Sequence, residues 1–193
     1  MAAITETLIA TMALTLVGEE PIDNIDDVNS KIAQIIRSYL SPVYRSVLEE
    51  HPWRFAQKRV SISPESTPPA FGYAYQYVLP SDFVSVTEIN GDRDTLFSVE
   101  NGRILIDSET INLMYTAEVV FFSMPSKFAL ALATNLASYL AYNVTGGKVR
   151  AAELMGMYEK NLYNAIFLDS RTGLGVSEAA EAGEGGTWHL RDG

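Results

Sequence analysis

"HPWRFAQKR", residues 51–59, follows a long run of helical periodicity and brings two aromatic rings and three positive charges together in an acidic chain. Pro52 ends the helical pattern, because proline cannot donate the next helical hydrogen bond and restricts the residue before it. From Trp53 onward, large apolar residues alternate with polar ones, which predicts a strand. We therefore expect Trp53 and Phe55 to point into the junction between a helical part and a sheet.

The positive charges of this stretch, on Arg54, Lys58 and Arg59, raise the question of a nucleic-acid contact. The chain has 193 residues and a formal net charge of −10. Nucleic-acid binding draws its affinity from many cations that contact phosphates, and this basic run is short and isolated. We expect Arg54 and Arg59 to face away from the junction, and these charges to meet acidic groups nearby or on a neighbouring subunit.

The composition is that of a globular chain, with 47% hydrophobic and 20% charged residues. The chain contains no cysteine, which excludes disulfides, thiolate zinc sites and thiol catalysis. Its two histidines, His51 and His189, have no metal-ligand spacing. No run reaches the roughly 18 apolar residues of a membrane span. No catalytic motif is recognisable, so we expect neither an enzyme nor a cofactor or metal.

Helical periodicity brackets a β-rich middle. Residues 3–17 predict a short amphipathic helix, and a second pattern begins after a cap at Asp26 or Asp27 and continues to about residue 50. Pro42 lies inside that pattern and marks either a kink or a helix restart. Two further helices are predicted, one capped by Ser123 or Ser126 and ended by the Gly146-Gly147 pair, and one over residues 148–169. We expect an α+β fold in which residues 1–52 and 121–170 form an antiparallel four-helix bundle.

The middle segment, residues 53–120, contains short β-rich runs separated by turn residues. It predicts an inserted antiparallel sheet of about five or six strands, with Asn101-Gly102 as its strongest hairpin turn. Tyr73, Tyr75 and Tyr77 alternate, so they share one face of a strand. A platform for single-stranded nucleic acid would need basic neighbours, which this run lacks. We favour packing in the core or at a subunit interface.

The last segment, residues 171–193, is small, polar and rich in glycine, which predicts a flexible tail. Near its end, "TWHLRDG" (187–193) places two apolar side chains, Trp188 and Leu190, beside His189 and Arg191. We interpret these four residues as a peptide that docks on another subunit or partner. The alternatives are that Trp188 returns to its own domain or that the end stays mobile.

The order of these segments resembles a known family. After a pair of helices come "HPWRFAQKR", "PAFGYAYQYVLPSDFVSVTEING" (69–91), "RILID" (103–107) and "INLMYTA" (111–117), followed by the helix "FALALATNLASYLAYNVTGG" (128–147) and one more helix. This pattern resembles the tail tubular protein A family, the head-to-tail adaptor of short-tailed bacteriophages. The resemblance covers about residues 3–170, and the "HPWRFA" and "FGYAYQYVLPSDF" motifs are its most specific parts.

The resemblance implies a structural virion protein, made in the cytoplasm of a bacterial host. Such adaptors form a ring, expected to be a homododecamer, that connects the portal protein to the tail nozzle and forms part of the DNA ejection channel. Double-stranded DNA would pass through the lumen without sequence-specific binding. C-terminal segments in the family reach toward the portal, which would give Trp188, Leu190 and Arg191 a role. A second hypothesis is a non-catalytic ligand- or carbohydrate-binding module that uses the tyrosine strand.

Overall fold

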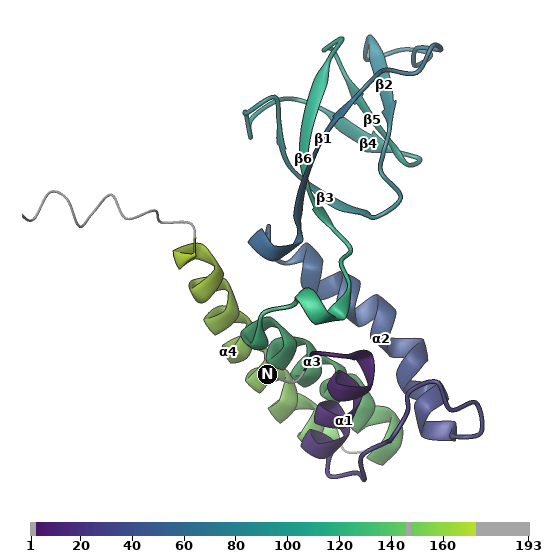
Figure 1. Cartoon of the computed structure of the whole chain (residues 1–193), viewed down its shortest axis with the longest axis vertical. Helices are drawn as coiled ribbons and strands as arrows, with labels where there is room; N and C mark the ends of the chain where they lie inside the picture. Colours follow the sequence, from purple (N-terminus) through teal and green to yellow (C-terminus); the bar gives the residue numbers. More distant parts are fainter. Residues whose placement is uncertain (1–2, 146–147, 173–193) are drawn as a thin grey trace, which may run out of the picture.

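The computed structural model describes residues 3–145 and 148–172 and contains helices at one end and strands at the other (Figure 1). The chain forms two helices, then six strands, then two further helices, and two short 3-10 turns mark the passages between these parts. The elements are α1 (Glu6–Val17), α2 (Lys31–Glu49), η1 (Arg54–Ala56), β1 (Gln57–Ile62), β2 (Tyr75–Val78), β3 (Phe83–Ile89), β4 (Ser98–Glu100), β5 (Arg103–Ile106), β6 (Ile111–Ala117), η2 (Phe121–Ser123), α3 (Ser126–Thr145) and α4 (Lys148–Arg171).

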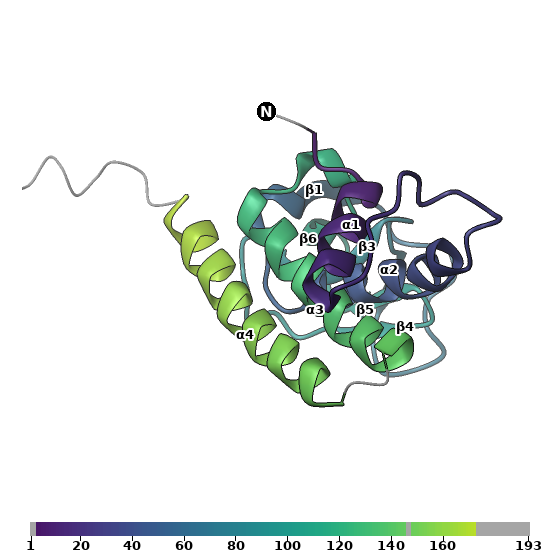
Figure 2. The same cartoon turned by 90° about the horizontal axis from the view of Figure 1, so that it is seen from below.

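The predicted antiparallel four-helix bundle is wrong. Helices α1, α2 and α4 each pack on α3, which lies among them when the molecule is seen from below (Figure 2). The reason is that α3 is buried around most of its circumference, whereas a bundle helix buries one stripe. Its column of small side chains lets neighbouring helices approach closely. The residues of that column are Ala129, Ala133, Ala137 and Ala141, all almost fully buried.

The helix boundaries correct two details of the prediction. Ser30 caps α2, and its hydroxyl accepts a hydrogen bond from the backbone N–H of Ala33. Asp27 instead accepts a hydrogen bond from the backbone of Asn29, in the turn before the helix. Helix α2 then continues through Pro42 without a restart, and Pro42 lies on the exposed face of the helix. Solvent can satisfy the carbonyl that the proline leaves without an N–H partner.

The β-rich segment forms two three-stranded antiparallel sheets, in the orders β1-β6-β3 and β2-β5-β4, instead of the single sheet predicted. Asn101 and Gly102 join β4 to β5, and both have positive φ, as the tight hairpin turn requires. The sheets share one apolar core. Its buried residues are Tyr77, Ile104 and Ile106 from one sheet and Ile89, Ile111, Leu113, Tyr115 and Ala117 from the other.

Candidate functional site at the helix–sheet junction

Trp53 is the anchor of the junction. Its side chain is 1% exposed, and its indole N–H donates a hydrogen bond of 2.9 Å to the backbone oxygen of Val47. The indole meets the ring of Phe128 edge to face at 4.9 Å, and Phe55 packs on the same phenylalanine at 4.8 Å. The indole therefore joins the end of α2 to the start of α3.

The expected strand does not begin at Trp53. Residues Arg54–Ala56 form the 3-10 turn η1, and β1 starts at Gln57. The turn places Ala56 in the helical core together with Trp53, whereas Phe55 is only half-buried. The short alternation of Trp53, Arg54 and Phe55 cannot distinguish a strand from a tight turn, and in this turn the buried residues are Trp53 and Ala56.

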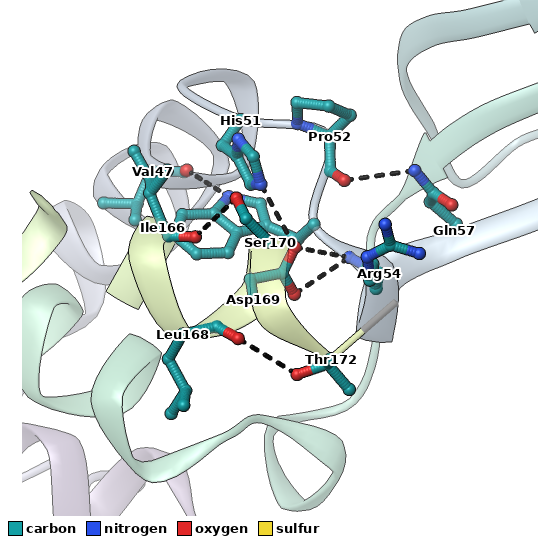
Figure 3. A network of polar contacts seen from close by, with 11 residues as sticks. Val47, His51, Pro52, Arg54, Gln57, Ile166, Leu168, Asp169, Ser170 and Thr172 are labelled. Atoms are coloured by element: carbon teal, nitrogen blue, oxygen red, sulfur yellow. Dashed lines mark hydrogen bonds and ion pairs between the residues drawn. The ribbon is translucent and has the colours of Figure 1, made fainter. Parts of the chain in front are cut away.

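Asp169, in the last turn of α4, closes the junction from the other side (Figure 3). Its two carboxylate oxygens accept hydrogen bonds of 3.1 and 3.3 Å from the backbone N–H of Arg54. The Nε2 atom of His51 lies 3.1 Å from the same carboxylate. The Asp169 side chain is only 9% exposed. It therefore fixes the end of α4 against the turn that leads from the helices into the strands.

The return connection from the strands to the helices is held by Tyr44. Its hydroxyl donates to the backbone oxygen of Val119 at 2.6 Å and accepts from the N–H of the same residue at 3.2 Å. Burial raises the pKa of the Tyr44 hydroxyl to about 12. Tyr44 therefore stays neutral over the physiological range and satisfies both backbone groups of Val119.

A third contact lies within the strands, close to the junction. Asp82 pairs with the ammonium group of Lys58 and accepts a hydrogen bond of 3.0 Å from the hydroxyl of Tyr115. Burial acts to raise the pKa of the Asp82 carboxyl, but the hydrogen bonds from Lys58 and Tyr115 outweigh it and lower the pKa below the usual 3.8. Burial, together with the hydrogen bond to Asp82, raises the pKa of Tyr115 to about 12.

The two arginines of the opening motif behave differently from Lys58. The side chains of Arg54 and Arg59 are exposed, and within the described part of the chain their guanidinium groups have no ion pair. Both line a surface cavity of about 380 Å³ together with Arg93, which lies in the loop between β3 and β4. Of the three cations in the opening motif, only Lys58 therefore has the expected acidic partner within the described chain.

The three tyrosines lie in different environments. Tyr77 is fully buried in the core of the two sheets, where its hydroxyl donates to the backbone oxygen of Ser108. Tyr75 is half-buried at the edge of that core, and Tyr73 precedes β2. Tyr73 lines a separate surface cavity of about 420 Å³ with the exposed ring of Phe71. Of the three alternating tyrosines, Tyr77 is therefore a core residue and Tyr73 lines a surface cavity.

The predicted docking peptide, Trp188, His189, Leu190 and Arg191, lies outside the described residues. Within residues 3–145 and 148–172, no cluster of three or more metal-ligating side chains is found. Among the described helices, none is long and apolar enough to cross a membrane.

Sequence reasoning missed Asp169, Tyr44 and Arg93. Asp169 and Tyr44 reach their partners across a large separation along the chain, and Arg93 comes to line one cavity with Arg54 and Arg59 only in the folded chain. No local spacing in the sequence marks such contacts. A scan against protein-family models gives no match, and neither does a search of curated proteins.

Proposed function

We propose that the chain is a structural virion protein, a head-to-tail adaptor that assembles into a ring between the portal protein and the tail nozzle. The proposal rests on the resemblance of the "HPWRFA" and "FGYAYQYVLPSDF" motifs to the tail tubular protein A family. The ring, of about twelve copies if it follows that family, would form part of the DNA ejection channel.

The observation that best supports a subunit role is an apolar face on α4. Val149, Tyr163 and Phe167 are exposed by 76%, 70% and 55%. Their spacing places them on the side opposite Leu154 and Tyr158, which pack into the helical core. Helix α4 lies at the edge of the helical part (Figure 2), so this face is open to another chain. Exposed aromatic side chains gathered on one face are typical of protein–protein contacts.

The negative charge of the chain favours a channel through which DNA passes over a surface that binds DNA tightly. A ring of subunits with a formal charge of −10 each would repel a DNA duplex or leave it free to slide. Stable binding to the backbone of DNA would need many cations on the lumen side. We therefore expect DNA to pass through the ring without sequence-specific contacts.

The tail provides the test of the portal contact. Deletion of residues 176–193 removes Trp188 and Leu190 but none of the described elements. The truncated chain should keep the unfolding transition of the full chain and lose attachment to portal rings in co-sedimentation. A matched control replaces Glu178 and Glu181 by glutamine and keeps both apolar residues. Portal attachment of undiminished strength by the truncated chain would contradict the proposed docking role.

One observation favours the alternative of a ligand-binding module. The cavity beside Phe71 and Tyr73 also contains polar groups, from Gln76, Glu100 and Arg103. Aromatic rings beside polar side chains are the usual chemistry of sugar recognition. Titration of soluble glycans, with Tyr73→Ala as the control variant, tests this candidate. Saturable binding that Tyr73→Ala abolishes would favour the module, whereas the adaptor proposal expects none.

A further inference from the structure

The cavity of about 380 Å³ at the junction contains an unusual concentration of positive charge for this chain. The whole sequence has 14 Lys and Arg residues against 24 Asp and Glu residues. Three of those cations, Arg54, Arg59 and Arg93, line one cavity, here called the arginine groove. In the described part of the chain, none of the three forms an ion pair. The three arginines outnumber the two carboxylates of the lining, and like charges repel one another, so an anionic occupant would stabilise the arginines.

The end of α4 forms one wall of the arginine groove. Asp169 and Ser170 line the cavity, and the helix ends one residue later, at Arg171 (Figure 3). Thr172, the last described residue, lines a neighbouring cavity that shares Arg54 and Asp169 with the groove, so the described chain ends close to the groove. Asp169 and Glu88 are the acidic members of the lining, and Asp169 is already engaged by His51 and the backbone of Arg54.

The C-terminal segment begins with an acidic run. Residues 177–184 read "SEAAEAGE" and place Glu178, Glu181 and Glu184 three residues apart, with no basic residue between them. Five residues separate Thr172 from Glu178, a tether that reaches about 20 Å when extended. Covalent attachment through so short a segment gives an effective concentration on the order of millimolar, so weak contacts suffice for intramolecular docking.

From the charge of the groove, its position and the length of the tether, we infer that the acidic run 178–184 docks on the arginine groove of its own chain. The three glutamates of the run form charge-assisted hydrogen bonds with Arg54, Arg59 and Arg93, and they exchange among these partners. Residues 185–193, with Trp188, extend beyond the docked run and remain available to a partner. The contact is intramolecular and does not depend on the adaptor function.

Duplex DNA is the main competing occupant, and the observations favour the tail. Glu88 and Asp169 in the lining disfavour a phosphate backbone, and the surrounding charge of the chain is strongly negative. A DNA molecule would have to approach from solution against that charge, whereas the acidic run is held beside the groove by covalent attachment.

Paramagnetic relaxation in the full-length chain tests the inference. Because the sequence contains no cysteine, the substitution Ala180→Cys gives a single site for a nitroxide label. In the isotope-labelled chain at low salt, the label should broaden the amide signals of Gln57, Arg59 and Arg93. The broadening should disappear at 1 M salt, where the Debye length is about 3 Å. It should also disappear when all three glutamates of the run are changed to glutamine.

Two further variants separate charge pairing from a structural effect. Arg59→Glu with Arg93→Glu should abolish the broadening, and adding Glu178→Lys, Glu181→Lys and Glu184→Lys should restore it. Arg37→Glu, on α2 and away from the groove, is the matched control and should change nothing.

Three results would overturn the inference. The first is broadening that survives both 1 M salt and the glutamine variant. The second is broadening only when a spin-labelled chain is mixed with a separate isotope-labelled chain, because the occupant would then be a second copy. The third is an absence of tail contact at low salt while a short DNA duplex shifts the arginine signals. None of these results bears on whether the chain forms a ring.

Discussion

At the scale of single residues, the junction between helices and strands depends on a few side chains that fill space between elements or hydrogen-bond to their backbone groups. Trp53 fills the space between α2 and α3 and satisfies a carbonyl at the end of α2. Asp169 and Tyr44 each hold backbone groups of the chain segments that enter and leave the strands. Because a buried polar group without a partner costs about 1–3 kcal/mol, these contacts fix the position of the connections as well as their stability.

Replacing Trp53 by alanine should destabilise the chain by about 3–5 kcal/mol, because it leaves a large cavity and removes the hydrogen bond to Val47. Urea unfolding followed by circular dichroism measures the change. Phe122→Ala is the control, since that ring is 71% exposed and its loss should cost less than about 0.5 kcal/mol. Equal stability of the Trp53→Ala variant and the wild type would mean that the indole does not anchor the joint.

Asp82 predicts a pH dependence of stability. Its pKa in the folded chain lies below the usual 3.8, so the folded state favours the ionised carboxylate more than the unfolded chain does. The stabilisation is fully present above the unfolded pKa and is lost as the pH falls through the folded one. The difference in unfolding free energy between wild type and Asp82→Asn should therefore be constant near neutral pH and shrink below about pH 4.

The control for this measurement is Asp94→Asn, at an exposed carboxyl in the loop between β3 and β4. This substitution removes a carboxyl that forms no ion pair within the described residues. A difference for Asp82→Asn that stays flat from neutral to acid pH would show that the contacts with Lys58 and Tyr115 do not favour the ionised form.

At the scale of elements, α3 explains why the helices do not form the predicted bundle. The helix carries a column of leucines, Leu132, Leu136 and Leu140, beside its column of alanines, and both columns are buried. Several polar residues between them, Thr134, Asn135 and Ser138, are also buried. Thr134 and Ser138 bond to backbone oxygens of α3 itself. Patterning based on polarity counts such residues as exposed and so assigns the helix one apolar face, where the structure gives it three neighbours.

The close approach of helices at α3 can be tested with a larger side chain. Ala133→Leu should destabilise the chain by about 1–3 kcal/mol, because the position is fully buried and its neighbours must move to admit the added carbons. Ala152→Leu, at an exposed position of α4, is the matched control and should be near neutral. Thermal unfolding of both variants decides the point, and an Ala133→Leu variant as stable as its control would show loose packing around α3.

The exposed face of α4 leads to a prediction about association. Changing Tyr163 and Phe167 together to serine should lower self-association, seen as a shift to smaller species in analytical ultracentrifugation, with the fold retained. The control changes Phe71 and Phe122 to serine, two phenylalanines outside α4 that are exposed by 88% and 71%. Loss of association in the control variant alone would mean that the subunit contact does not lie on α4.

At the scale of the whole molecule, local signals predicted most element positions and few of the contacts between them. The Asn101-Gly102 turn, the four helices and the β-rich middle follow from spacing and turn chemistry. The division of the strands into two sheets does not, because pairing β6 with both β1 and β3 joins segments far apart in the chain. The arginine groove likewise arises only when η1, β1 and the β3–β4 loop meet in space.

Assembly into a ring is the central feature of the proposed function, and the mass of the purified chain tests it most directly. Native mass spectrometry of the 21.2 kDa chain, alone at rising concentration and mixed with the portal protein that the proposed function requires, gives the copy number of each species. We predict a closed ring of about twelve copies, alone or on the portal, by analogy with the ring assemblies that such symmetry produces. A chain that remains a monomer under both conditions, at micromolar concentrations, would contradict the proposed function.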